Sequence, residues 1–172
     1  MTLATLFFQS DLGWIRIIAN QNSVTRIDFA EPETAQKTNA SAAANPHLHH
    51  LQAAKQQLQE YFAGVRTQFN LPLAPEGTPF QQAVWTALTT IPYGATCSYK
   101  HIAELVDRPK GSQAIGQANS KNPISIVIPC HRVVGSNGKL TGYAGGLDRK
   151  AALLQREKQT ALTTITSQSI GA

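Results

Sequence analysis

The sequence predicts an α+β fold in two parts, a small N-terminal α/β part with an antiparallel sheet and a mostly helical C-terminal part. Three observations lead to this prediction. Segments of strand type fill the first 30 residues, capped apolar stripes of helix type dominate the second half, and a stretch rich in Pro and Gly around residues 72–77 separates the two. We expect domains at residues 1–76 and 77–157, followed by a flexible tail at residues 158–172.

The N-terminal part contains three segments of strand type, at residues 4–9, 13–18 and 24–30. Arg26 to Phe29 alternates polar and apolar residues, which is the pattern of a half-buried strand. Residues 31–46 hold few large apolar groups and are expected to form an exposed loop. A helix is expected from His47 to Phe62, and a short strand around Phe69 to Leu71.

The C-terminal part begins with a well-marked helix start. Thr78 is expected to cap this helix, and Gln81 completes a capping box. Ser98 is expected to cap a second helix and Ser112 a third, across a short break at residues 107–111. Two short helices joined in this way fit a helix-turn-helix, whose second helix enters a DNA groove. A plain helical hairpin has the same pattern, so both interpretations remain open.

The segments after these helices are shorter. The apolar run from Ile124 to Ile128 predicts a buried strand that leads to Cys130. Asn137-Gly138 marks a tight turn of hairpin type. A last helix is expected from about Asp148 to Glu157, with no pattern beyond it.

Composition and charge narrow the function classes. No apolar run is long enough to span a membrane, and the N-terminus lacks the pattern of a signal peptide, so we expect a cytoplasmic protein with reduced thiols. Residues 77–157 hold 9 basic and 4 acidic side chains, whereas residues 1–76 hold 5 basic and 6 acidic ones. A basic half indicates a polyanionic partner, most often nucleic acid, although basic domains without such a partner also exist.

Cys130 is one of two cysteines, and His131 follows it directly. A thiol attacks as the thiolate and has an ordinary pKa of about 8.5, so a neighbouring group must take its proton. His131 can act as this base or as a relay. On spacing alone, Cys130 is either a nucleophile or a small buried residue.

Glu157 is a candidate to orient the imidazole of His131. It shares a helix face with Leu147, Ala151 and Leu154, and a carboxylate on a core-facing stripe needs a partner. The alternative is a carboxylate at the helix end that pairs with Arg149 or Lys150.

Ile128 to Val134 (IPCHRVV) resembles the active-site motif of the O6-alkylguanine-DNA alkyltransferases. The first 76 residues resemble the smaller N-terminal domain of this family more loosely, and the chain as a whole is similar to the stand-alone bacterial Ogt type. The resemblance implies an RNase H-like N-terminal domain. Further motifs follow in family order and spacing: Phe80–Trp85 (FQQAVW), Ile91–Gly94 (IPYG), Ser98-Tyr99, Asn122-Pro123, Thr141–Gly146 (TGYAGG), Arg149-Lys150 and Leu153-Leu154 through Glu157.

The resemblance also implies a reaction. A nucleotide with O6-alkylguanine, and also O4-alkylthymine, would be flipped out of double-stranded DNA approached from the minor groove. Its alkyl group would pass irreversibly to Cys130 in a single turnover, by a monomer without a cofactor. His131 would deprotonate Cys130 through a water, and Glu157 would hold the imidazole.

The family pattern assigns the remaining site residues. Tyr99 would donate a hydrogen bond to the leaving guanine and crowd the phosphate, and Asn122 would fix the turn before the active-site strand. Tyr143, Ala144 and Gly145 would line the pocket, with the Ala144 N–H bound to guanine O6. Further DNA contacts are expected from Lys100, Arg108, Gln113 and Ser136.

Two features depart from the family. Gln113 stands where relatives usually have an arginine that fills the gap left by the flipped base, so we expect weaker or slower flipping. Some relatives hold a structural zinc, but no cysteine precedes Cys97, and His47, His49 and His50 are not a sufficient ligand set, so no metal is expected. Three alternatives remain: a cysteine hydrolase, a non-catalytic protein that binds alkylated bases, and a helix-turn-helix regulator.

Overall fold

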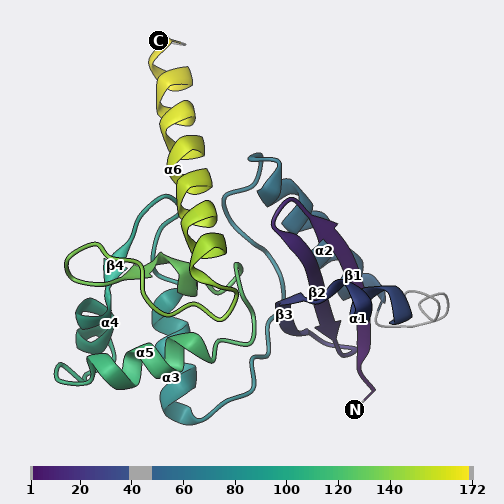
Figure 1. Cartoon of the computed structure of the whole chain (residues 1–172), viewed down its shortest axis with the longest axis horizontal. Coiled ribbons are helices and arrows are strands. Elements are labelled where there is room, and N and C mark those ends of the chain that lie inside the picture. The colour runs from purple at the N-terminus through teal and green to yellow at the C-terminus, as the bar shows by residue number, and fades with distance from the viewer. Residues whose placement is uncertain (1, 39–47, 171–172) are drawn as a thin grey trace. The chain divides into compact units, whose positions relative to one another are not determined.

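The computed structural model describes residues 2–38 and 48–170 (Figure 1). The chain forms two compact units. Residues 1–76 and 123–127 make up the first, and residues 77–122 and 128–172 make up the second. The chain therefore leaves the second unit at residue 123 and returns to it at residue 128, just before Cys130.

The first unit is built on a three-stranded antiparallel sheet in the order β1-β2-β3 (Figure 1). Ile17 pairs with Leu6 on one side and with Ile27 on the other, and all three side chains are buried. Helix α2 packs on all three strands and α1 on β1 and β2, so they close the core of this unit. The elements are β1 (Ala4–Ser10), β2 (Gly13–Ala19), β3 (Val24–Ala30), α1 (Pro32–Thr38) and α2 (Leu48–Phe62).

Helix α2 follows from its sequence, because Leu51, Ala54, Leu58 and Tyr61 recur on one face and are all buried. Residues 31–46 were expected to form an exposed loop. This expectation was wrong for Pro32–Thr38, which form α1, while residues 39–46 lie outside the described residues. His47 lies outside them too.

Two expected strands are single bridges instead. The strand expected around Phe69 to Leu71 is absent from the described residues, and Leu73 forms an isolated bridge with Val24. In the apolar run from Ile124 to Ile128, only Ile124 bridges to the sheet, at Ile27. The Ile27 N–H donates to Pro123 O at 2.9 Å and the Ser125 N–H to Ile27 O at 2.8 Å. Ile126 then has a φ of 72°, a value that a regular strand does not adopt.

The second unit is mostly helical, as expected. Thr78 and Gln81 form the expected capping box, and Ser98 accepts a hydrogen bond from the His101 N–H. The expectation for Ser112 was wrong, because Gly111 is the N-cap of α5 and gives no side-chain bond. The elements are α3 (Pro79–Leu88), β4 (Cys97–Ser98), α4 (Tyr99–Leu105), α5 (Ser112–Ser120), the 3₁₀ turn η2 (Cys130–Arg132), β5 (Val133–Val134) and α6 (Leu147–Ile170), with β4 parallel to β5.

Helix α6 differs from expectation in length and in its buried face. It does not end near Glu157 but continues to Ile170, through residues expected to lack regular structure. The buried side chains are Lys150, Leu153 and Glu157, whereas Leu147 is 47% exposed and Ala151 is exposed. The buried face is therefore rotated from the one expected, although Glu157 belongs to both. In the described part of the chain, no helix is long and apolar enough to cross a membrane.

Candidate active site around Cys130

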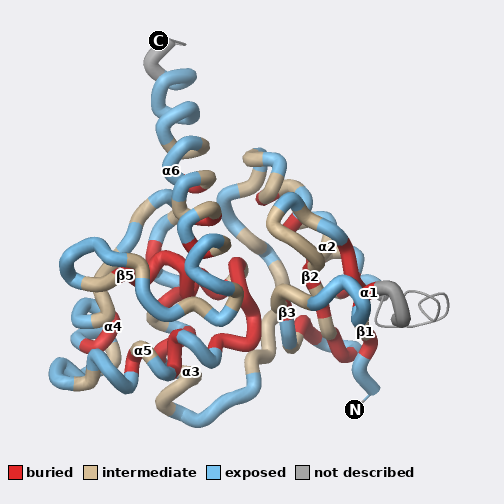
Figure 2. The backbone as a smooth tube through the Cα atoms, viewed as in Figure 1, coloured by how far each residue is buried: buried red, intermediate tan, exposed pale blue. Residues whose placement is uncertain are grey.

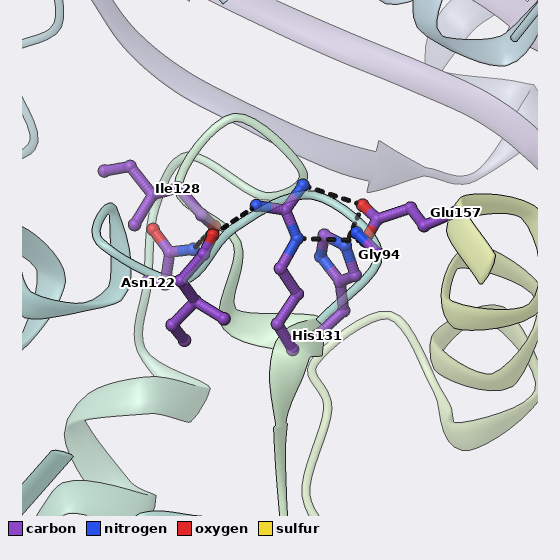
Figure 3. Close-up of polar contacts among 7 residues, drawn as sticks. Gly94, Asn122, Ile128, His131 and Glu157 are labelled. Atoms are coloured by element: carbon purple, nitrogen blue, oxygen red, sulfur yellow. Dashed lines mark hydrogen bonds and ion pairs between the residues drawn. The ribbon is translucent and has the colours of Figure 1, made fainter. Parts of the chain in front are cut away.

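Cys130 begins the turn η2, inside a buried stretch that runs from Ile128 to Val134 (Figure 2). Its side chain is 3% exposed. Two asparagines hold the backbone here, Asn119 near the end of α5 and Asn122 just beyond it. Asn122 Nδ2 donates to Ile128 O at 2.8 Å (Figure 3), and Asn119 Nδ2 donates to Cys130 O at 3.2 Å. Asn122 was expected to fix a turn that leads into a strand. The turn that it holds leads into η2 instead.

The surroundings of the Cys130 thiol act on its pKa in opposite directions. Burial raises the pKa, while a hydrogen bond from the Asn122 side chain, the charge of Lys150 and backbone N–H groups lower it. Burial is the largest of these effects, so the thiol is protonated at rest. Attack on a substrate carbon therefore requires a base.

The Nε2 atom of His131 lies 2.7 Å from Oε1 of Glu157, and both side chains are buried (Figure 3). Burial lowers the pKa of His131, against the opposing effect of Glu157, so the ring is neutral near pH 7. A carboxylate only accepts, so Nε2 carries the ring proton and Nδ1 keeps a lone pair. Among the described residues, Nδ1 has no hydrogen-bond partner although it is buried. The ring can therefore act as a base, because its Nδ1 atom is available to accept a proton.

Glu157 receives a second partner, Arg132, which the sequence analysis did not assign. Arg132 Nε donates to Oε2 and Nη2 to Oε1, both at 2.9 Å, and Nη1 donates to Ile91 O at 2.7 Å. The Gly94 N–H also approaches Oε2, at 3.4 Å (Figure 3). Burial raises the pKa of Glu157, but the hydrogen bonds from His131 and Arg132 prevail and lower it to about 2. Glu157 is therefore a permanently charged acceptor, not a proton store.

Lys150 is the other residue that the sequence analysis missed. It is fully buried, with 0% of its surface exposed, and Nζ donates to Thr141 O at 2.7 Å. The hydroxyl of Tyr99 donates to the same oxygen at 2.8 Å, and Lys150 Nζ lies 5.8 Å from the centroid of the Tyr99 ring. Burial lowers the pKa of Lys150. Glu157 thus has His131 and Arg132 among its partners, and it is buried in the middle of α6 instead of at the helix end that the alternative pair with Lys150 or Arg149 assumed.

The remaining expected residues lie at the surface or near it. Tyr99 begins α4, and Tyr143 to Gly145 lie in a turn that the Gly146 N–H closes onto Tyr143 O at 3.0 Å. Tyr99, Tyr143 and Gly145 are half-buried and Ala144 is exposed. Apart from Tyr99, the residues expected to touch DNA are all exposed: Lys100, Arg108, Gln113 and Ser136.

Both halves of the chain match a known family. Residues 4–75 match the family described as 6-O-methylguanine DNA methyltransferase, ribonuclease-like domain, and residues 79–159 match its DNA binding domain. The chain belongs to this methyltransferase family. The expectations of the family and of its fold class are therefore confirmed.

Named relatives and solved structures agree with the family. A methylated-DNA–protein-cysteine methyltransferase of Methanosarcina acetivorans is 45% identical over 87% of this chain and 95% of the relative. The constitutive enzyme of Bacillus subtilis is 46% identical over 87% of this chain and 92% of its own. The O6-methylguanine methyltransferase of Mycobacterium tuberculosis superposes with a TM-score of 0.78 at 40% identity, over 92% of this chain and 94% of that one. The same bacterial protein in complex with DNA gives 0.79 at 42% identity, over 91% and 93%.

Proposed function

We propose that this protein repairs O6-alkylguanine in DNA by transferring the alkyl group to Cys130, once per molecule. The observation that carries the proposal is the buried Cys130 next to a neutral His131 whose other nitrogen is held by Glu157. The names of the relatives support the same reaction, since each is a methylated-DNA–protein-cysteine methyltransferase.

The proton on the Cys130 thiol leaves first. His131 Nδ1 accepts it through a bridging water, because this nitrogen has a lone pair and no partner among the described residues. Glu157 accepts the Nε2–H and stabilises the imidazolium that forms. With its pKa at about 2, Glu157 keeps its charge through this step and takes no proton itself.

The thiolate then attacks the alkyl carbon. The S–C bond forms as the C–O6 bond breaks, and the electron pair leaves on the guanine. The guanine anion is neutralised by the proton that His131 took from the thiol, which returns through water. The product is a thioether, whose C–S bond water does not hydrolyse, so each molecule acts once. Tyr99 would donate to the leaving guanine, but its hydroxyl donates to Thr141 O here, so it must exchange that partner when the base enters.

DNA binding is assigned to α4, α5, the turn between them and the turn after β5. Lys100, Arg108, Gln113 and Ser136 are exposed, as groups that contact a duplex must be. We propose that the protein approaches DNA from the minor groove and acts as a monomer. We also propose that it works in the cytoplasm and that residues 1–76 form a separate domain. Titration of a labelled duplex tests the stoichiometry.

The deciding experiment uses duplex DNA that carries O6-methylguanine labelled in the methyl group. The wild-type protein should take up one label per molecule, and Cys130→Ala should take up none. Cys97→Ala is the matched control and should retain the label, because Cys97 has no part in the reaction. Repeated turnover would favour the cysteine hydrolase instead, and binding without label would favour a non-catalytic damage-binding protein.

A further inference from the structure

Asn119 is buried beside the nucleophile with one end of its amide unpaired. It lies near the end of α5, and its surface is 2% exposed. The carbonyl of Cys130 only accepts hydrogen bonds, so Nδ2 of Asn119 must be the atom that faces it. Oδ1 is then fixed on the other side, where no group among the described residues donates to it. Buried acceptors without a donor are rare, so this oxygen points to a ligand.

Asn119 lies on the face of α5 that carries both Tyr99 and Cys130, the residues expected to border the flipped base. Gly116 precedes Asn119 by one helical turn and so shares its face of the helix. A Cβ on Gly116 would meet the ring of Tyr99 at 3.9 Å, so the ring covers that glycine. On this face of α5, Tyr99 therefore covers Gly116, and the backbone of Cys130 lies against Asn119. Asn119 therefore lies one turn from the residue that Tyr99 covers, with its own amide against the backbone of Cys130.

We propose that Asn119 Oδ1 accepts a hydrogen bond from the exocyclic amino group of the damaged guanine, which makes Asn119 a specificity-determining residue. This inference rests on the proposed function. In O6-alkylguanine the ring nitrogen N1 has no hydrogen, so the amino group at C2 is the one N–H donor of the base. A site built around that donor discriminates against a base that lacks it, because the buried acceptor then stays unpaired. O4-alkylthymine has no amino group and gains nothing from Oδ1.

The test compares two duplexes that differ in this amino group alone, one with O6-methylguanine and one with O6-methylhypoxanthine. Single-turnover rate constants are measured with labelled methyl groups, and the final label per molecule gives the active fraction. The wild-type protein should react about tenfold faster with O6-methylguanine. Ser120→Ala, on the exposed side of α5, is the matched control and should keep this ratio.

Two variants separate the ends of the amide. Asn119→Leu removes both, and the ratio of the two rates should fall to about one. Asn119→Asp keeps an acceptor oxygen but loses the donor to Cys130 O, so both rates should fall while the ratio is kept. Because a ratio is measured on the active molecules, partial misfolding of a variant does not affect it.

The proposal is overturned if Asn119→Leu keeps the wild-type ratio of the two rates. This includes the case in which both rates fall equally, because that is the result expected if Asn119 only holds Cys130. A wild-type ratio of one would overturn it as well. Absence of label from both duplexes in the wild-type protein would instead reject the proposed function.

Discussion

Arg132 and Glu157 are joined by two parallel hydrogen bonds of 2.9 Å, although they lie 25 residues apart in the chain. The pair is buried, and its carboxylate also accepts from His131 at 2.7 Å. Arg132 extends this cluster to the turn before β4, where Nη1 reaches Ile91 O. The guanidinium thus fixes the carboxylate that orients the proposed base.

Replacing Arg132 with Met should destabilise the fold by about 3–5 kcal/mol, because it leaves a buried carboxylate with a neutral imidazole as its main partner. Arg132→Lys should cost less, since an ammonium keeps the charge but cannot form both parallel bonds. Urea denaturation at pH 7 measures the free energy of unfolding. Arg108→Met, at an exposed position, is the control and should change it little. Equal losses in Arg132→Met and Arg108→Met would contradict the role of the pair.

Glu157 makes the stability of the fold depend on acid. Its pKa is about 2 in the folded state against an ordinary 4.5, so its contribution is complete above pH 4.5 and disappears as the pH falls through 2. A shift of this size corresponds to up to about 3 kcal/mol. The wild-type protein should therefore lose more stability between pH 5 and pH 3 than Glu157→Gln does. Parallel unfolding curves over this range would contradict the prediction.

The acid limit of the reaction should follow His131. Burial lowers its pKa, so the folded state resists protonation and the ring remains a base as the pH falls below the ordinary value of 6.5. Single-turnover rates measured against pH should decline on the acid side below about 6.5, the ordinary value. Glu157→Gln removes the group that raises this pKa, and should slow the reaction while moving the acid limb lower still. A limb that moves upward in that variant would show that another group titrates.

Local elements followed from the sequence where their causes were local. The capping box of Thr78 and Gln81 and the cap at Ser98 depend on neighbours within three residues, and both are present. Helix α6 beyond Glu157 has no apolar pattern, and its Thr and Ser hydroxyls donate to carbonyls one turn back, as Thr163 does to Gln159 O at 2.9 Å, which does not by itself favour a helix. Periodicity alone did not predict this extension.

The candidate site was predicted less completely, because its polar residues are buried by partners distant in sequence. Cys130, His131 and Glu157 were candidates from their spacing and chemistry before the family motifs supported them, and the last two do meet. Lys150 was given no role of its own in the site, because a lysine is rarely buried without a partner. Its partner, Thr141 O, is a backbone oxygen, and no side-chain pattern in the sequence marks such an acceptor.

Lys150 offers a variant that should separate activity from folding. Lys150→Met fills a similar volume and removes a buried charge, so the free energy of unfolding should change little. The charge of Lys150 lowers the pKa of the Cys130 thiol, and its bond holds Thr141, so the pKa should rise and the loop should loosen. The transfer rate at pH 7 should fall by roughly ten- to a hundredfold. Iodoacetamide reactivity against pH reports the thiol, and the exposed Lys158→Met is the control.

Gln113 sets the last expectation, for base flipping. It is exposed on α5, at the position where the family resemblance led us to expect an arginine, and a glutamine can stack on the orphan base but adds no charge. Gln113→Arg should raise both the affinity for damaged duplex and the single-turnover rate, by about tenfold. Gln117→Arg places the same charge one turn further along the exposed helix, and should raise the affinity without the rate. If both variants raise the rate equally, the gain is electrostatic attraction alone and Gln113 has no special part in flipping.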